Sequence, residues 1–219
     1  MSAIFVSHSK RDEDAKRVFS EAFAGLNVAG VFMEYEKAAG KEANRTTIRD
    51  SISASSAMFV ILSRNVRDVP YTRDWVTSES GAACNKDVWV FEPVDQIGEI
   101  DVVVPWARHY AVYNNSNDFF QYLRQIIISY DDTNQLATAL LGTGVGTAVG
   151  YAVAKKEKGL GATVGGVLGF MLGFILSNKS RVRPPGLGFT CSHCQASYDV
   201  HLMEGTTRFR CPVCNTIYD

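Results

Sequence analysis

Short apolar runs alternate with amphipathic helical patterns over the first part of the chain, and this alternation constrains the fold more than any other feature. The apolar runs cover residues 3–7, 28–33, 57–63, 87–91 and, more weakly, 110–113. Apolar side chains spaced three and four residues apart predict helices at 15–26, 44–55, 74–84 and 119–128. Such an alternation predicts an α/β fold, with a parallel sheet covered by helices on both faces.

Charge and composition exclude several classes of function. The 219 residues include 22 Lys and Arg against 23 Asp and Glu, a net charge of -1, so no global positive field favours nucleic acid. Hydrophobic residues make up 46%, which is enough for a packed core. Residues 1–14 contain no apolar run long enough for a secretory signal, which predicts a cytosolic amino end.

The carboxyl ends of the predicted strands are where a parallel sheet binds ligands, which directs attention to residues 7–10, 34–40 and 63–73. No Gly-x-Gly-x-x-Gly follows the first strand, and this argues against an ordinary dinucleotide-binding dehydrogenase. Trp75 and Glu79 lie four residues apart in the third predicted helix and therefore share one face. A carboxylate beside an indole can face a pocket.

Three motifs resemble those of TIR (Toll/interleukin-1 receptor) domains of prokaryotic type. They are FVSHSKRD from Phe5, VFMEYEK from Val31 followed by Gly40, and DWVTSE from Asp74. The resemblance covers about residues 1–130 and implies a TIR domain over residues 1–135 with a flavodoxin-like parallel sheet. Family members with enzymatic activity cleave the nicotinamide glycosidic bond of NAD, and their essential glutamate corresponds to Glu79.

The same resemblance implies further contacts with the substrate. His8, Ser9 and Trp75 are expected to bind NAD, while Phe32, Glu36 and Lys37 are expected to contact NAD or a neighbouring subunit. Many relatives have Asp where this chain has Glu34, so the role of that position does not transfer directly. A single carboxylate suffices for the chemistry, because the nicotinamide of NAD is already cationic and departs neutral. The product would be ADP-ribose or a cyclic form of it.

Less specific interpretations of these residues remain open. Glu79 can be a solvated helix residue and Trp75 a core aromatic, in a noncatalytic TIR signalling scaffold that works by self-assembly. His8 can be a loop histidine beside the cleft, and Ser9 with Asp12 fits a helix start.

Glycine is concentrated in residues 136–178, which hold 10 of the 18 glycines. Two uncharged stretches, 136–154 and 160–177, flank the charged sequence KKEKG and are each near the minimum length that spans a bilayer. Glycines repeat every four residues in both stretches, at 142, 146 and 150 and at 161, 165, 169 and 173, which lets helix backbones approach closely. We expect a glycine-zipper transmembrane hairpin that places the TIR domain and the carboxyl tail on the cytoplasmic side and helps the chain to self-associate. A soluble hairpin between subunits and a membrane-disrupting pore are the alternatives.

Four cysteines in two Cys-x-x-Cys pairs end the chain. After a predicted linker at 179–188, Cys191 and Cys194 are separated by 16 residues from Cys211 and Cys214, a spacing typical of a four-cysteine structural Zn²⁺ site. Residues 189–219 resemble prokaryotic zinc ribbons and also rubredoxin, although Gln195 replaces the glycine often found after a rubredoxin pair. The ribbon is predicted to be an independent unit that is structural or binds a partner not identified by the sequence.

The full set of motifs predicts a membrane-anchored TIR protein that consumes NAD once its domains cluster, in a role such as cell defence. The alternative from another class is the noncatalytic scaffold or membrane-disrupting effector.

Overall fold

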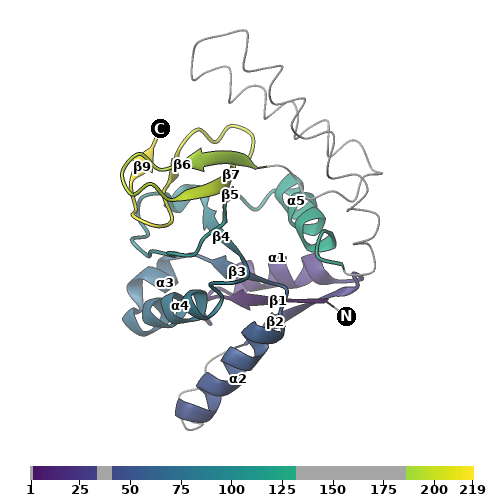
Figure 1. Ribbon diagram of the computed structural model, residues 1–219. Helices are drawn as coiled ribbons and strands as arrows, with labels where there is room; N and C mark the ends of the chain where they lie inside the picture. The colour runs from purple at the N-terminus through teal and green to yellow at the C-terminus, as the bar shows by residue number, and fades with distance from the viewer. Residues whose placement is uncertain (1, 34–40, 132–185) are drawn as a thin grey trace.

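The computed structural model describes residues 2–33, 41–131 and 186–219 (Figure 1). Five parallel strands form the main sheet in the order β2-β1-β3-β4-β5. Their bounds are β1 Ser2–Ser7, β2 Val28–Phe32, β3 Ala57–Ile61, β4 Asp87–Pro93 and β5 His109–Tyr113. This is a flavodoxin-like α/β arrangement, and it confirms the parallel sheet predicted from the alternation of patterns.

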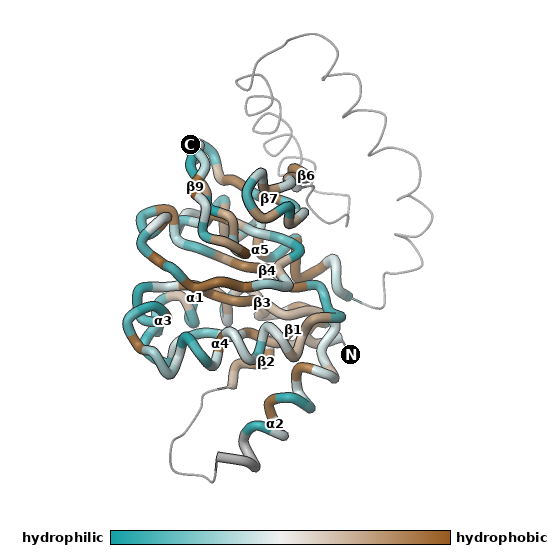
Figure 2. The backbone as a smooth tube through the Cα atoms, turned by 60° about the vertical axis from the view of Figure 1, so that its left-hand side comes forward, coloured by the Kyte–Doolittle hydropathy of each residue, from teal (hydrophilic) through white to brown (hydrophobic). Residues whose placement is uncertain are grey.

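Helices cover both faces of the sheet (Figure 1). One face carries α1 (Glu13–Phe23) and α5 (Asn117–Ile128), and the other carries α2 (Lys41–Ala54), α3 (Arg64–Asp68) and α4 (Pro70–Ala82). A 3-10 turn, η1 (Val94–Gln96), follows β4. Each face has its own hydrophobic core, and the strands that contribute to both cores are the most hydrophobic part of the tube in Figure 2.

The loop after β3 differs from the prediction. The short helix α3 was not predicted, and α4 begins at Pro70, so Asp74 is an exposed residue inside the helix rather than its cap. Proline fits the first turn of a helix because its fixed φ is helical and its missing N–H needs no partner. A periodicity of apolar residues does not reveal this polar first turn.

Asp12 ties the end of β1 to the loop after β3. It stands at the amino end of α1 but makes no capping hydrogen bond with its side chain. Its carboxylate instead accepts hydrogen bonds from Ser63 Oγ and Asn65 Nδ2, each at 2.5 Å. The two loops at the carboxyl edge of the sheet are therefore held together through one carboxylate.

The carboxyl-terminal segment is joined to the main sheet, and the prediction that it is independent is wrong. β6 (Leu187–Thr190) and β7 (Ser197–His201) form a hairpin, and β7 pairs in parallel with β5. The sheet thus has seven strands and continues through β7 to β6 (Figure 1). Two short strands, β8 (Phe209–Arg210) and β9 (Ile217–Tyr218), form a separate ribbon, and β6 begins inside the predicted linker.

A buried ion pair reinforces this junction. Arg210 Nε donates to Glu92 Oε2 at 2.7 Å, and their side chains are 1% and 0% exposed. Tyr110 donates its hydroxyl to the same carboxylate oxygen at 2.7 Å, and Arg210 Nη1 donates to the Val102 carbonyl at 3.0 Å. The ribbon is therefore attached to the sheet by matched charges as well as by strand pairing.

The predicted glycine-zipper hairpin, residues 136–178, lies outside the described residues. Within the parts of the chain that are described, no helix has the length and apolar character needed to cross a bilayer.

Candidate functional site

Glu79 is held at the junction of α4 and the carboxyl end of β1. Val76, one turn earlier, is fully packed in the core, and the same face of α4 turns Glu79 inward, so that it is only 6% exposed. The hydroxyl of Ser7, the last residue of β1, donates a hydrogen bond to Glu79 Oε2. The carboxylate therefore lies at the edge of the sheet where ligands bind in this architecture.

The environment of Glu79 provides little to compensate its charge. Burial raises its pKa from the ordinary 4.5 to about 7, and the hydrogen bond from Ser7 only partly opposes this rise. Within the described residues, no Lys, Arg or His forms an ion pair with this carboxylate. A buried acid without a fixed countercharge is typical of functional sites, where a ligand supplies the missing charge.

Trp75 lies one turn before Glu79 and is partly buried. Its indole stacks on the ring of Tyr71 with centroids 6.2 Å apart, and the Arg45 guanidinium lies 5.8 Å above the indole ring. Arg45 comes from α2, so this aromatic group connects α2 with α4. Trp75 and Glu79 lie on one helix as predicted, and Arg45 is a neighbour of Trp75 that the sequence did not reveal.

His8 and Phe32 lie together where β1 and β2 end. Their rings meet edge to face at a centroid distance of 5.8 Å, and His8 Nδ1 is 3.1 Å from the Val6 carbonyl oxygen. Ser9 is 2% exposed, and its Oγ accepts a long hydrogen bond of 3.3 Å from the Arg11 amide. These predicted residues thus gather at the same edge of the sheet as Glu79. The other two, Glu36 and Lys37, lie outside the described residues together with Glu34.

Ser7 is the site residue that sequence reasoning missed. It belongs to the segment at the end of the first strand, which the position of ligands in parallel sheets already marked. Only the packing of α4 against β1 shows that its hydroxyl meets Glu79. The signal in the sequence was a serine at the carboxyl end of a buried strand.

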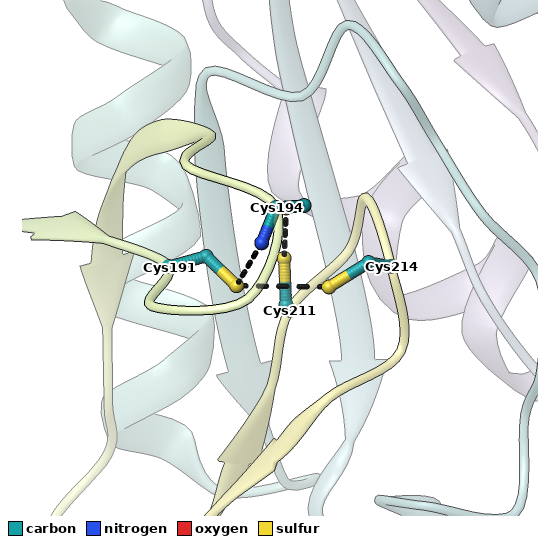
Figure 3. Close-up of side chains that lie close together, drawn as sticks. All are labelled: Cys191, Cys194, Cys211 and Cys214. Carbon is teal, nitrogen blue, oxygen red and sulfur yellow. Dashed lines mark hydrogen bonds between the residues drawn. The ribbon is translucent and has the colours of Figure 1, made fainter.

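The four cysteines meet as predicted and form a centre that fits a metal ion (Figure 3). Their sulfur atoms lie within 4.8 Å of one another, with Cys191 to Cys214 at 3.6 Å and Cys194 to Cys211 at 3.8 Å. Four thiolates placed tetrahedrally at about 2.3 Å from one ion are about 3.8 Å apart, whereas a disulfide needs about 2.0 Å. The geometry therefore fits metal binding and excludes a disulfide.

Each Cys-x-x-Cys pair lies on a tight turn, or knuckle, and the two knuckles have the same backbone conformation. Gln195 and Asn215, the residues after each pair, have φ of 62°. The amides of these residues donate to the carbonyls of Cys191 and Cys211, both at 2.9 Å. The left-handed turn explains why glycine is common at these positions in similar knuckles. Burial alone would raise the pKa of Cys191, but hydrogen bonds from the Tyr218 hydroxyl and from backbone amides lower it to about 6, which favours the thiolate.

A cavity of about 500 Å³ opens between the turn after β4 and the loop before β8. Its lining includes Val94, Glu99, Gly205 and Arg208 but none of the residues predicted to bind NAD. The cavity and the Glu79 region are thus separate features of the described molecule.

Comparison with known proteins finds no family model, no curated protein and no solved structure that matches the chain.

Proposed function

We propose that the chain is a TIR-type NAD glycohydrolase in which Glu79 is the catalytic residue. The observation that carries this proposal is the buried Glu79 carboxylate, which accepts a hydrogen bond from Ser7 and has no positive partner among the described residues. A cationic ligand would supply the missing charge, and the nicotinamide ribose of NAD is such a group.

The reaction needs little from the protein beyond this carboxylate. The bond between C1′ of the ribose and the nicotinamide nitrogen breaks, and its electron pair returns the nicotinamide to a neutral ring. Glu79 stabilises the oxocarbenium ion that develops on the ribose. The electrostatic attraction between the carboxylate and this cation is strongest in a site shielded from water. Water then attacks C1′ and loses a proton, giving ADP-ribose, or an atom of the adenosine part attacks and gives a cyclic product.

The surrounding residues have supporting roles in this proposal. Ser7 orients the Glu79 carboxylate through its hydroxyl. His8 and Phe32 form an edge-to-face pair that offers a wall for the dinucleotide, and Trp75 offers part of another. Residues 136–178 would anchor the chain in a membrane, where clustering brings the domains together, and the four cysteines would hold a structural Zn²⁺.

One contact favours the alternative of a noncatalytic scaffold. The indole of Trp75 is already engaged by Tyr71 and Arg45, as expected for an aromatic whose function is to join α2 to α4. In that alternative the domain acts by self-assembly and Glu79 is only a buried polar residue.

The test is an NAD assay on the full chain, clustered on vesicles or through a fused oligomer. Clustered wild type should consume NAD, and Glu79→Gln, which keeps the size of the side chain, should reduce kcat/KM by at least a hundredfold, roughly the loss of one transition-state contact. Asp74→Asn changes an exposed carboxylate on the same helix and should leave the rate unchanged. If clustered wild type consumes no NAD, the catalytic proposal is contradicted and the scaffold alternative is supported.

The pH profile adds a second readout. Because catalysis uses the ionised carboxylate, kcat/KM should rise as the pH passes about 7, the pKa of Glu79 in the free protein. A bound cationic nicotinamide favours the carboxylate, so the profile of kcat should turn at a lower pH than that of kcat/KM. Identical profiles would contradict a contact between Glu79 and the cationic nicotinamide riboside of bound NAD.

A further inference from the structure

A second group of metal-binding side chains lies where the carboxyl-terminal hairpin joins the main sheet. His109 is on β5, and Asp199 and His201 are on β7, with His109 directly opposite Asp199 in the parallel pairing. Residues two apart in a strand point to the same side, so Asp199 and His201 face His109 together. Their ligand atoms lie within 4.8 Å of one another.

The distance between His109 and Asp199 fits an ion between these two side chains better than a direct hydrogen bond. His109 Nδ1 is 3.4 Å from Asp199 Oδ2, which is longer than a normal charge-assisted hydrogen bond. Two ligand atoms at about 2.0 to 2.1 Å from a tetrahedral ion are separated by about 3.3 to 3.4 Å. His109 is 7% exposed, and its Nδ1 is buried without a hydrogen bond to any described residue.

The opposite nitrogen of each imidazole already faces an oxygen. His109 Nε2 is 3.4 Å from Asp87 Oδ1, and His201 Nδ1 is 2.5 Å from the Tyr122 hydroxyl. Asp87 is itself fixed by a 2.9 Å hydrogen bond from Tyr130. Histidines that bind metals usually have such an outer partner, which sets the tautomer and directs the other nitrogen to the ion.

The backbone at Gly186 and the indole of Trp89 pack closely against these side chains. A Cβ at Gly186 would lie 2.6 Å from Asp199 Cβ and from His201 Nε2, so only glycine allows the backbone to pass this close to the two side chains. The Trp89 indole stacks on the His109 imidazole at a centroid distance of 4.1 Å, and it contacts the tilted His201 ring at 4.7 Å. The Asp199 side chain is 44% exposed, which gives an ion a path from solvent.

We propose that His109 Nδ1, His201 Nε2 and the Asp199 carboxylate bind a second divalent transition-metal ion, distinct from the one at the four cysteines. Two imidazoles and a carboxylate are a donor set that suits zinc and its neighbours in the series. A water completes the coordination, since three protein ligands leave one tetrahedral position. The ion fastens β7 to β5 and so couples the ribbon to the main sheet.

The first experiment counts zinc in the full chain, by elemental analysis after equilibration with Zn²⁺ and removal of excess ion. Wild type should hold two Zn²⁺ per chain, and Asp199→Ala, which truncates a partly exposed side chain, should hold one. His193→Ala removes an exposed histidine from the first cysteine knuckle and should still hold two. Tyr122→Phe should lower the affinity of the second site for Zn²⁺ by about 10-fold to 100-fold. One Zn²⁺ in wild type, or two in Asp199→Ala, would overturn the proposal.

A second measurement needs no variant. Imidazole ¹⁵N spectra of the zinc-loaded wild type should show opposite tautomers, with His109 bound through Nδ1 and His201 through Nε2. Addition of Ni²⁺ in place of the second Zn²⁺ should quench the fluorescence of Trp89, which contacts both ligands. A proton on His109 Nδ1 at saturating Zn²⁺ means a simple ion pair with Asp199 and would refute the site.

Discussion

Glu79 and Glu92 are both buried at the same sheet, yet within the described residues only Glu92 has a positive partner. Burial raises the pKa of both carboxyls. For Glu92 this rise is opposed by the charge of Arg210 and by hydrogen bonds from Tyr110 and Arg210. For Glu79 the hydroxyl of Ser7 is the one opposing group in the part of the chain that the structure describes. Among the described residues, the charge of one carboxylate is therefore balanced by a cation, and the charge of the other is not.

The largest effect on stability is expected from breaking the buried ion pair between Arg210 and Glu92. Arg210→Met leaves the Glu92 carboxylate buried without its cation, which should lower the free energy of unfolding by about 3 to 5 kcal/mol. Chemical denaturation of the full chain measures this loss. Arg208→Met is the control, because Arg208 pairs with Asp219 at 3.0 Å on the exposed surface and should contribute less than about 1 kcal/mol.

The double variant Glu92→Leu with Arg210→Met sharpens this result. Both charges are then absent, and the loss should be smaller than for Arg210→Met alone, because no unpaired ion stays buried. An equal or greater loss in the double variant would show that packing, rather than charge, dominates at this junction.

The next effect concerns Glu79 and depends on pH. Its pKa is about 7 in the folded protein against an ordinary 4.5, so between these values the folded state binds more protons than the unfolded one. Stability is then lost as the pH rises through this window, by up to about 3 kcal/mol above pH 7. Glu79→Gln has no such loss, so its stability relative to wild type should increase from pH 4.5 to pH 8. Parallel stability curves for the two proteins would contradict an uncompensated carboxyl.

The smallest effect is a difference in stability between variants of the two cysteine knuckles. Gln195→Gly removes the backbone strain of a non-glycine residue with positive φ on the surface, and it should stabilise the chain by up to about 1 kcal/mol. Asn215→Gly removes the same backbone strain, but it also removes two hydrogen bonds. Asn215 Oδ1 accepts a hydrogen bond from Arg210, and its Nδ2 donates one to the Asp101 carbonyl at 3.0 Å. Its loss should cost about 1 kcal/mol net, because the buried Arg210 loses a partner. The midpoints of thermal unfolding of both variants provide the comparison. Equal shifts in Tm would mean that the hydrogen bond from Arg210 to Asn215 does not contribute to stability.

Much of the fold could be predicted from local sequence. Apolar runs and helical spacing report which side chains are buried, and they placed the five parallel strands and four of the helices. The four-cysteine centre was also predictable, since two Cys-x-x-Cys pairs at this spacing are typical of a metal site with four thiolate ligands. Trp75 and Glu79 shared a helix face for the same periodic reason.

The start of α4 and the attachment of the ribbon could not be predicted in this way. Helix α3 and the first turn of α4 are polar, so periodicity gave no signal for them. The pairing of β7 with β5 uses backbone groups, which carry no signature of their partner strand. The sequence alone therefore suggested an independent ribbon.

The sequence by itself determined an α/β sheet, a four-thiol centre and an acidic residue beside a tryptophan, because each depends on residues close together in the chain or on a fixed period. Only the tertiary structure decided that Ser7 meets Glu79, that Arg210 neutralises Glu92 and that His109 faces Asp199 and His201. These contacts join residues 72 to 118 positions apart in the first two cases, and their formation depends on which elements pack together.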